Sequence, residues 1–449
     1  MATTKRSRAL LRACAALTTL LLLATACDSG SESSSDATGD EATSVGTGSD
    51  TDTAASIEVP DAYTAVVADV LGAPTYPFLG TDGDYHVAYD LGLQNTSVGV
   101  DATITQIEVV AADDPSTVVH TVAGGALVDP DCVVGDCDRL RNLTGQPVES
   151  STIEPQGGRM VFIDFSAPER EDLPDNVLHR IVGQGATSPA SQEPSDIDYL
   201  AAPYDISAGE APVIGPPLAG DNWVALNGCC DPGFPHRSSP GPFNGKIVNG
   251  QRFAIDWKQM NDDGEFFEGD PNSNESYVDY GADILAVADG TVVATLDGMP
   301  ANEPGVLPAD DPELRDQLTV ETVDGNHIVL DLGNGVYAFY AHLQAGTLEV
   351  EEGDTVERGD KLAELGNTGN ANASHLHFHL MDGPSVLGSN GLPYVIDEFD
   401  FAGQVDPQTL IDSDDFLSGE YNTGQLADPE SRTDESPLQL NIIDFPAGG

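Results

Sequence analysis

Basic side chains are scarce in this chain of 449 residues, and lysine is almost absent. Lysine and arginine together number 17 against 75 aspartates and glutamates, which gives a formal net charge of −58 at pH 7. The lysines are Lys5, Lys246, Lys258 and Lys361. Binding to nucleic acid phosphates or to an anionic membrane surface requires basic patches, so this composition excludes both from the expected partners.

Long apolar runs are also few. One covers residues 13–26, follows the basic residues of the first twelve positions, and is shorter than a spanning helix requires. This pattern is typical of a secretory signal peptide. Cys27 directly follows Ala24-Thr25-Ala26, which resembles a bacterial lipoprotein box. The resemblance implies that residues 1–26 are removed and that a lipid on Cys27 is the sole membrane attachment of an extracytoplasmic protein; a plain signal peptide cleaved nearby is the alternative.

Cysteine is rare too, with six in the chain. One lies in the signal peptide and one is Cys27, so four remain for an oxidising compartment, where they allow three pairings. We predict that Cys132 pairs with Cys137 and closes a small loop. Cys229 and Cys230 are then either a vicinal pair or free thiols.

Composition divides the chain after the signal peptide. Residues 27–56 contain almost nothing apolar and predict a flexible tether. Residues 57–207 hold short runs of β-branched and aromatic residues between turn residues, which predicts a β-sandwich. A linker at 208–220 leads to a second β domain at 221–401, and an acidic tail with little core of its own covers 402–449. The predicted fold class is mainly β: a sandwich followed by an antiparallel β-sheet domain.

Two hairpins are predicted in the second domain. Asp289-Gly290 stands between the apolar runs 286–288 and 291–293, and Asp-Gly between such runs is a strong hairpin signal. Residues 328–332 and 336–340 flank Gly333-Asn334-Gly335 in the same manner. Long helical periodicity is absent from this part of the sequence.

Histidines gather in this second domain, which holds six of the nine in the chain. His375, His377 and His379 alternate with Leu376, Phe378 and Leu380, a pattern that predicts a strand with one imidazole face and one core face. The Cα atoms of neighbouring histidines on such a face are about 6.5 Å apart along the strand. One can therefore bind a metal while the next contacts the water bound to that metal.

Two further elements carry candidate residues. Tyr340-Ala341-His342-Leu343 ends the second predicted hairpin. Asp256 lies in the apolar, strand-like run 252–257, where a carboxylate is costly unless it is paired or bound to a metal. An ion pair with Arg252 is the alternative explanation for this aspartate.

Together these motifs resemble the lysostaphin-like (LytM-type) zinc metallopeptidase family. The resemblance covers about residues 223–401 and includes, besides the two histidine motifs, Gly366-Asn367-Thr368-Gly369 and the stretches at 286–292 and 353–360. It implies a compact antiparallel β fold with a groove over the sheet. It also implies one zinc ion held by two histidines and one aspartate, and cleavage of peptide bonds, usually in peptidoglycan.

Carried over by position, Asp256 and His377 correspond to zinc ligands, and His342 and His375 to the two catalytic histidines. His379 is either a partner of a ligand or strand surface. The family's first metal histidine, four residues before the aspartate, is here Arg252, whose guanidinium stays protonated and cannot bind zinc.

The third ligand must therefore come from elsewhere or be missing. His236, 20 residues before Asp256, is the candidate we favour, with Cys229 or Cys230 as the other option. We expect an exported zinc metalloendopeptidase whose substrate is peptidoglycan or another peptide. The alternative is a catalytically inactive relative that binds the cell wall or activates other wall hydrolases.

Overall fold

The structure is a computed structural model, and it describes residues 59, 61–72, 74–129, 137–206, 209–408 and 424–446. The predicted signal peptide, the tether with Cys27, and Cys132 lie outside the described residues. Cys137 is disulfide-bonded, and its pairing with Cys132 stays a prediction. Within the described ranges, no helix is long and apolar enough to cross a membrane.

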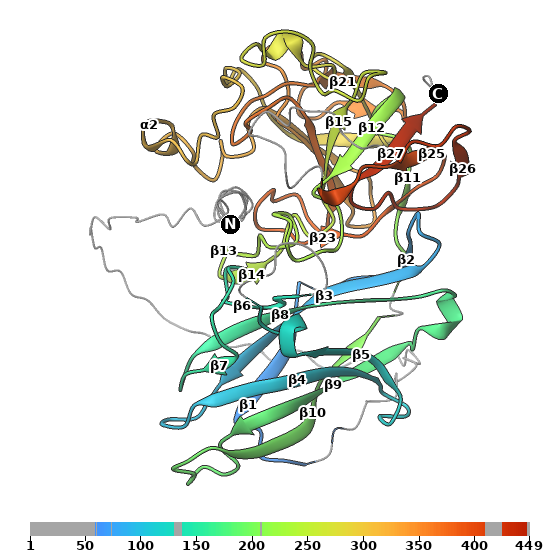
Figure 1. The fold of residues 1–449 in the computed structure, drawn as a ribbon. Coiled ribbons are helices and arrows are strands. Elements are labelled where there is room, and N and C mark those ends of the chain that lie inside the picture. Colours follow the sequence, from blue (N-terminus) through green and yellow to red (C-terminus); the bar gives the residue numbers. More distant parts are fainter. Residues whose placement is uncertain are drawn as a thin grey trace, which may run out of the picture.

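The first part of the chain forms two facing antiparallel sheets (Figure 1). One sheet has the order β1-β3-β8-β6, with β2 added at β3, and the other has the order β10-β9-β4-β5, with β7 added at β4. The strands are β1 Val66–Leu71, β2 Phe78–Leu79, β3 Tyr85–Asn95, β4 Ala102–Ala111, β5 Val118–Ala123, β6 Leu140–Arg141, β7 Thr152–Ile153, β8 Gly158–Ala167, β9 Asn176–Gly185 and β10 Ser195–Asp205.

A single apolar core fills the space between these two sheets. Alternate residues of the strands point into it, among them Val87, Leu91, Ile107, Ile163 and Ile181, all fully buried. This alternation is the expected pattern of a sandwich with one face of each sheet toward the core. Short helices η1 Gly124–Ala126 and η2 Arg170–Asp172 lie in its connections.

The second part is built on one large sheet whose order is β20-β17-β18-β19-β22-β15-β12-β27-β25-β26, with β23 added at β22. Its strands are β12 Gly220–Leu226, β15 Ile255–Gln259, β17 Gly290–Leu296, β18 His327–Asp331, β19 Tyr337–Ala341, β20 Thr355–Val356, β22 Leu376–Met381, β23 Gly391–Leu392, β25 Phe399–Gln404, β26 Glu430–Arg432 and β27 Asn441–Phe445.

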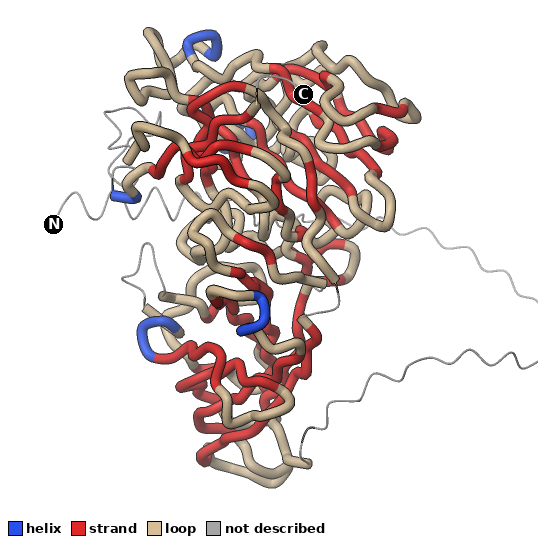
Figure 2. The backbone as a smooth tube through the Cα atoms, turned by 90° about the vertical axis from the view of Figure 1, so that its right-hand side faces the viewer, coloured by secondary structure: helices blue, strands red, loops and turns tan. Residues whose placement is uncertain are grey.

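Small two-stranded sheets and short helices complete this second part. The pairs are β11 Val213–Ile214 with β24 Val395–Ile396, β13 Gly241–Phe243 with β14 Lys246–Val248, and β16 Asp283–Leu285 with β21 Lys361–Glu364. The short helices are η3 Asn274–Ser276 and α2 Pro312–Arg315. The tube in Figure 2 shows strands throughout both parts of the molecule and very little helix. The prediction of a mainly β fold is confirmed.

Two sequence predictions in this part are wrong. Gly290 begins β17, but the partners of β17 are β18 and β20, so residues 286–293 form no hairpin. Residues 441–445 are not a tail: β27 pairs with β12 on one side and β25 on the other, and Ile442 and Ile443 are fully buried. By contrast, the predicted hairpin around Gly333-Asn334-Gly335 is the β18–β19 pair.

Candidate metal centre and active site

Three neighbouring strands of the large sheet bring the predicted site residues together. In the antiparallel pair β15–β22, Asp256 lies directly opposite His377, and in the pair β19–β22, Ala341 lies opposite the same histidine. His342 follows the last residue of β19, and His375 precedes the first residue of β22. Strand register alone therefore gathers four residues that are far apart in the sequence.

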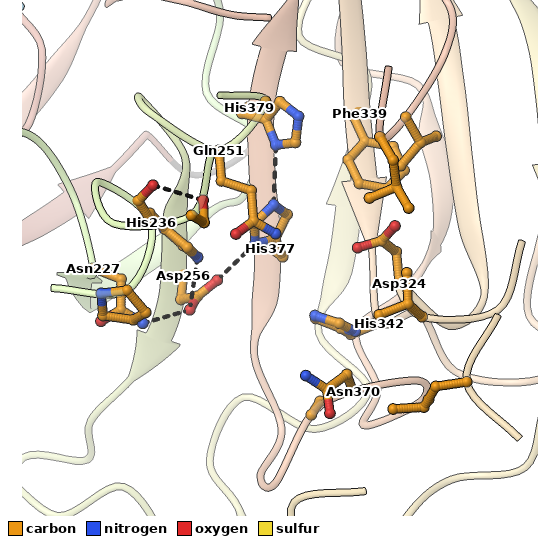
Figure 3. Close-up of a pocket in the computed structure, with 18 of the residues that line it drawn as sticks. Asn227, His236, Gln251, Asp256, Asp324, Phe339, His342, Asn370, His377 and His379 are labelled. Carbon is orange, nitrogen blue, oxygen red and sulfur yellow. Dashed lines mark hydrogen bonds and ion pairs between the residues drawn. The ribbon is translucent and has the colours of Figure 1, made fainter. Parts of the chain in front are cut away.

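The histidine strand has the two faces that its alternation predicts. Leu376, Phe378 and Leu380 belong to the apolar core of the second part. His377 and His379, both nearly fully buried, line a cavity of about 200 Å³ on the other face. The cavity wall also contains His375, together with Asp256 and His342, which Figure 3 labels. Packing of the leucines and the phenylalanine thus fixes the direction of the imidazoles.

The carboxylate of Asp256 is the centre of the group. Its Oδ1 lies 3.0 Å from His377 Nδ1 and 3.4 Å from His375 Nε2, and its Oδ2 lies 3.3 Å from His236 Nε2. The amide of Asn227 donates to Oδ2 at 2.7 Å. Burial alone raises the pKa of this carboxyl, but the histidines around it outweigh burial and hold the pKa well below its usual range. Asp256 is therefore an anion at neutral pH.

His236 reaches this carboxylate from residues 227–240, the segment between β12 and β13, which we call the His236 loop. Its Nδ1 donates to the carbonyl of Ala254 at 2.9 Å, which in a neutral ring leaves a lone pair on Nε2. That lone pair faces Asp256. Burial lowers the pKa of His236, yet the charge of Asp256 more than compensates and the net shift is upward. A positive charge between the two groups is thus favoured, whether a proton or a metal ion.

These contacts fit a metal ion. His236, Asp256 and His377 each offer one ligand atom, and the three atoms lie within 4.8 Å of one another. Zinc with bonds of about 2.0–2.2 Å holds tetrahedral ligand atoms roughly 3.4 Å apart, close to the separations from Asp256 given above. Two imidazoles and a carboxylate are the donors of many catalytic zinc sites. The described residues therefore fit one zinc ion with three protein ligands.

His379 contacts the ring nitrogen of His377 that does not face Asp256. Its Nδ1 lies 2.9 Å from Nε2 of His377, so a proton on His377 Nε2 leaves Nδ1 of His377 free to face Asp256. The other ring nitrogen of His379 is buried without a hydrogen-bond partner in the described part of the chain. Burial lowers the pKa of His377 to about 4 and that of His379 well below its usual range, so both rings are neutral.

His342 and His375 form the other side of the group, with ring centroids 4.7 Å apart. Each donates Nδ1–H to a backbone carbonyl, His342 to Thr368 at 2.8 Å and His375 to Ala373 at 2.9 Å. These hydrogen bonds leave Nε2 of each ring directed elsewhere, and Nε2 of His375 lies 3.4 Å from Oδ1 of Asp256. Burial keeps the pKa of His342 well below its usual range, so this ring is a neutral base at pH 7.

The alternatives that involve Arg252 and the cysteines are wrong. Arg252 is fully buried and turns away from the cavity, with Nη1 at 3.4 Å from Asp90 and Nη2 donating to the carbonyl of Gly72 at 2.6 Å. It makes no ion pair with Asp256. Cys229 and Cys230 are joined in a vicinal disulfide, so neither offers a thiolate to a metal.

The cavity-lining residues that sequence reasoning missed include Asn227, Gln251 and Asp324 (Figure 3). Asn227 follows β12, where Leu226 lies opposite Asp256, and this register is the only signal that could have placed it near the carboxylate. Asp324 lies in a loop, and its backbone carbonyl accepts from the backbone N–H of His342 at 3.1 Å. No spacing rule in the sequence points to that contact.

Comparison with known proteins finds a family profile over part of the chain and several similar solved structures. Residues 276–388 match the sequence profile of Peptidase family M23. No curated protein matches the chain.

Solved structures similar to the chain include the catalytic domain of lysostaphin from Staphylococcus simulans, with 23% identity, 34% of this chain and 80% of that chain covered, and a TM-score of 0.19. The catalytic domain of the M23 protein EnpA from Enterococcus faecalis has 17% identity, 40% and 92% coverage, and a TM-score of 0.22. A zinc-containing peptidase from Vibrio cholerae has 17% identity, 49% and 58% coverage, and a TM-score of 0.20.

Proposed function

We propose that the chain is an exported zinc metalloendopeptidase that cleaves peptide bonds in peptidoglycan, because residues 276–388 match the profile of Peptidase family M23. One observation carries the proposal: His236, Asp256 and His377 offer three ligand atoms at one point of a cavity that His342 and His375 also line. Metal donors and proton acceptors are thus present in one place.

His236, Asp256 and His377 would hold the ion. A bound zinc polarises a peptide carbonyl and lowers the pKa of a coordinated water to about 7. The chain itself supplies the remaining chemistry. His342 and His375 line the cavity with their Nε2 atoms, which can take a proton from the attacking water and stabilise negative charge that develops on the carbonyl oxygen. The hydrogen bonds from their Nδ1 atoms to Thr368 and Ala373 hold both rings in this tautomer.

Metal analysis of the purified protein tests the proposal. We expect close to one equivalent of zinc, and a His377→Ala variant that binds no zinc and no longer hydrolyses purified peptidoglycan. A wild-type protein with less than about a tenth of an equivalent, not restored by added zinc, would refute the proposal, because a site of this kind holds one ion.

A second candidate function follows from Arg252, which occupies the position of the family's first metal histidine. Relatives that lack a zinc ligand can bind the wall or activate other hydrolases, and in that case His377→Ala would leave wall binding intact with no hydrolysis to lose. Hydrolysis by the wild-type protein, lost in the variant while wall binding persists, distinguishes the enzyme from the binding module.

We also propose that a lipid on Cys27 holds the protein at a membrane and that residues 27–56 act as a tether. The basic start of the chain and the small residues before Cys27 support this. We expect the wild-type protein in the membrane fraction and a Cys27→Ser variant outside it. Equal fractionation of both would contradict the anchor.

A further inference from the structure

The His236 loop has no helix or strand of its own, yet it carries a proposed metal ligand. An imidazole on such a segment must be held by contacts from outside, because ordering a loop costs conformational entropy. Besides the carbonyl of Ala254 in the second part, the sandwich domain supplies such contacts. Arg141 on β6 donates to the carbonyl of Pro232 at 3.1 Å, and Ser238 in the loop donates to the same carbonyl at 2.6 Å.

Arg237, the residue after His236, makes the main contact. Its guanidinium forms an ion pair with Asp90 on β3, and both side chains are almost completely buried. Nη2 of Arg237 also donates to the carbonyl of Tyr89 at 2.9 Å, and the guanidinium lies over the ring of Phe162 at 4.2 Å. A buried guanidinium that loses its carboxylate partner strongly destabilises the fold. Arg237 is therefore held close to Asp90.

Asp90 holds more than one group of the second part. Its Oδ2 accepts from Arg252 Nη1 at 3.4 Å and from Asn249 Nδ2 at 3.1 Å. Nδ2 of Asn249 also donates to the carbonyl of Arg237 at 3.3 Å. Arg252 precedes Ala254, whose carbonyl accepts the Nδ1–H of His236. One carboxylate of the sandwich therefore fixes both segments that orient the imidazole.

We propose that the sandwich domain completes the metal site, with Asp90 as a positioning residue that acts through Arg237 on His236. The inference rests on the proposed function. Arg252 contacts the sandwich and binds no metal. The ligand role falls to His236, on a loop that the contacts with the sandwich immobilise.

Metal affinity measured by competition with a chelator, with Co²⁺ and Zn²⁺ as probes, tests this positioning role. We expect Asp90→Asn to weaken metal binding at least tenfold and to alter the visible absorption of the Co²⁺ protein. The matched control is Asp164→Asn, which breaks the ion pair of Arg139 and Asp164 within the sandwich. We expect the control to lower thermal stability while metal affinity stays at the wild-type value.

Equal metal affinity in a folded Asp90→Asn protein overturns the inference alone. A wild-type protein that binds no metal overturns the proposed function and the inference together. Should Asp90→Asn lose cooperative unfolding, Arg237→Lys is measured in the same way, since lysine keeps the charge but not the forked geometry. We expect the same loss of affinity from it.

A second inference rests on an independent observation, the side chain of Asp324. It is only 7% exposed, and no donor in the described part of the chain bonds its carboxyl group. The group points into the cavity between Phe339 and His342 (Figure 3). Leu318 and Val323 also line the cavity. A buried carboxylate without a partner favours a cation that comes from outside.

We infer that Asp324 forms a subsite for a primary ammonium group of the peptide substrate, a role that deepens the proposed function. The apolar wall would contact the carbon stem of the group and the carboxylate its charge. Burial raises the pKa of Asp324 to about 7, so an approaching ammonium ion would favour its ionised form. The strongly negative protein would in addition attract cationic peptides.

Equilibrium binding by calorimetry tests this subsite without requiring turnover. The probes are a lysine-containing peptide, its Nε-acetylated form, and its form acetylated at the α-amino group, so that the two sources of ammonium are distinguished. We expect acetylation of one amino group to weaken binding to the wild-type protein at least tenfold and to have no effect on Asp324→Asn. If the variant loses the same factor for every probe, or acetylation never matters, the subsite is refuted, whether or not the protein hydrolyses peptides.

Discussion

At the scale of single residues, the proposed site depends on one carboxylate. Asp256 contacts His236, His375 and His377 at once, and Asn227 holds its second oxygen. Asp256→Asn keeps the size of the side chain but removes its charge. We expect zinc binding to fall by at least a hundredfold, as measured by chelator competition. A variant with unchanged affinity would show that the metal is held elsewhere.

His342 should separate catalysis from metal binding. Its ring is neutral and hydrogen-bonded to Thr368, and it is not one of the three proposed ligands. We expect His342→Ala to keep one zinc ion per chain and to lose roughly 10²–10⁴-fold in kcat, the usual contribution of a proton-transferring group. His327→Ala is the control, because that ring packs on Phe339 outside the donor group. Loss of zinc from His342→Ala would contradict the assignment.

Asp324 should give the protein a measurable pH dependence. Burial raises its pKa from 3.8 to about 7, so between these values the folded protein keeps a proton that the unfolded chain has released. Stability therefore falls as pH rises through this window, by up to roughly 4 kcal/mol at about 1.36 kcal/mol per unit. We expect Asp324→Asn to lack this contribution in urea unfolding of the metal-free protein at pH 4 and pH 8. Parallel pH profiles for both proteins would contradict the shift.

At the scale of elements, a substitution in β27 tests whether this strand belongs to the large sheet. Ile443 on β27 is fully buried in the main core, between β12 and β25. Ile443→Ala should lower the free energy of unfolding by about 2–5 kcal/mol, the usual cost of such a cavity. Glu430→Ala, on the exposed edge strand β26, is the control, and we expect little change from it. An equally small effect of both substitutions would mean that β27 does not belong to the sheet.

Local pattern predicted several of the longer strands and failed where pairing is long-range. The alternation of His375 to Leu380 identified both faces of β22, because one face packs in the core and the other lines the cavity. Asp289-Gly290 indicated a hairpin, yet residues 286–289 join β16 to β17, which have different partners. The apolar run 441–445 is too short to indicate its place in the sheet without knowledge of β12 and β25.

The site could be predicted in part for the same reason. Asp256, His342, His375 and His377 lie on or beside strands, where register fixes their neighbours. His236 lies on a loop, and its direction depends on contacts with Asp90 across a domain boundary, which no spacing in the sequence encodes. Asp324 lies on a loop, and a backbone hydrogen bond from His342 to its carbonyl holds it beside the cavity.

At the scale of the whole molecule, the excess of carboxylates determines how stability responds to salt. With a net charge of −58, the folded protein repels itself more strongly than the expanded chain does. Salt shortens the range of this repulsion to about 3 Å at 1 M, from about 30 Å at 0.01 M. We therefore expect the thermal midpoint to rise with sodium chloride over this range in differential scanning calorimetry. A falling midpoint would mean that attractive surface ion pairs outweigh the excess of carboxylates.

The position of β27 also orders the events of biosynthesis. Every proposed donor of the metal group has been synthesised once β22 is made, but β12, the neighbour of the strand that carries Asp256, still lacks its second partner. That partner arrives only with residues 441–445. A chain that stops between β22 and β27 therefore holds every proposed metal donor but lacks the strand that pairs with the free side of β12.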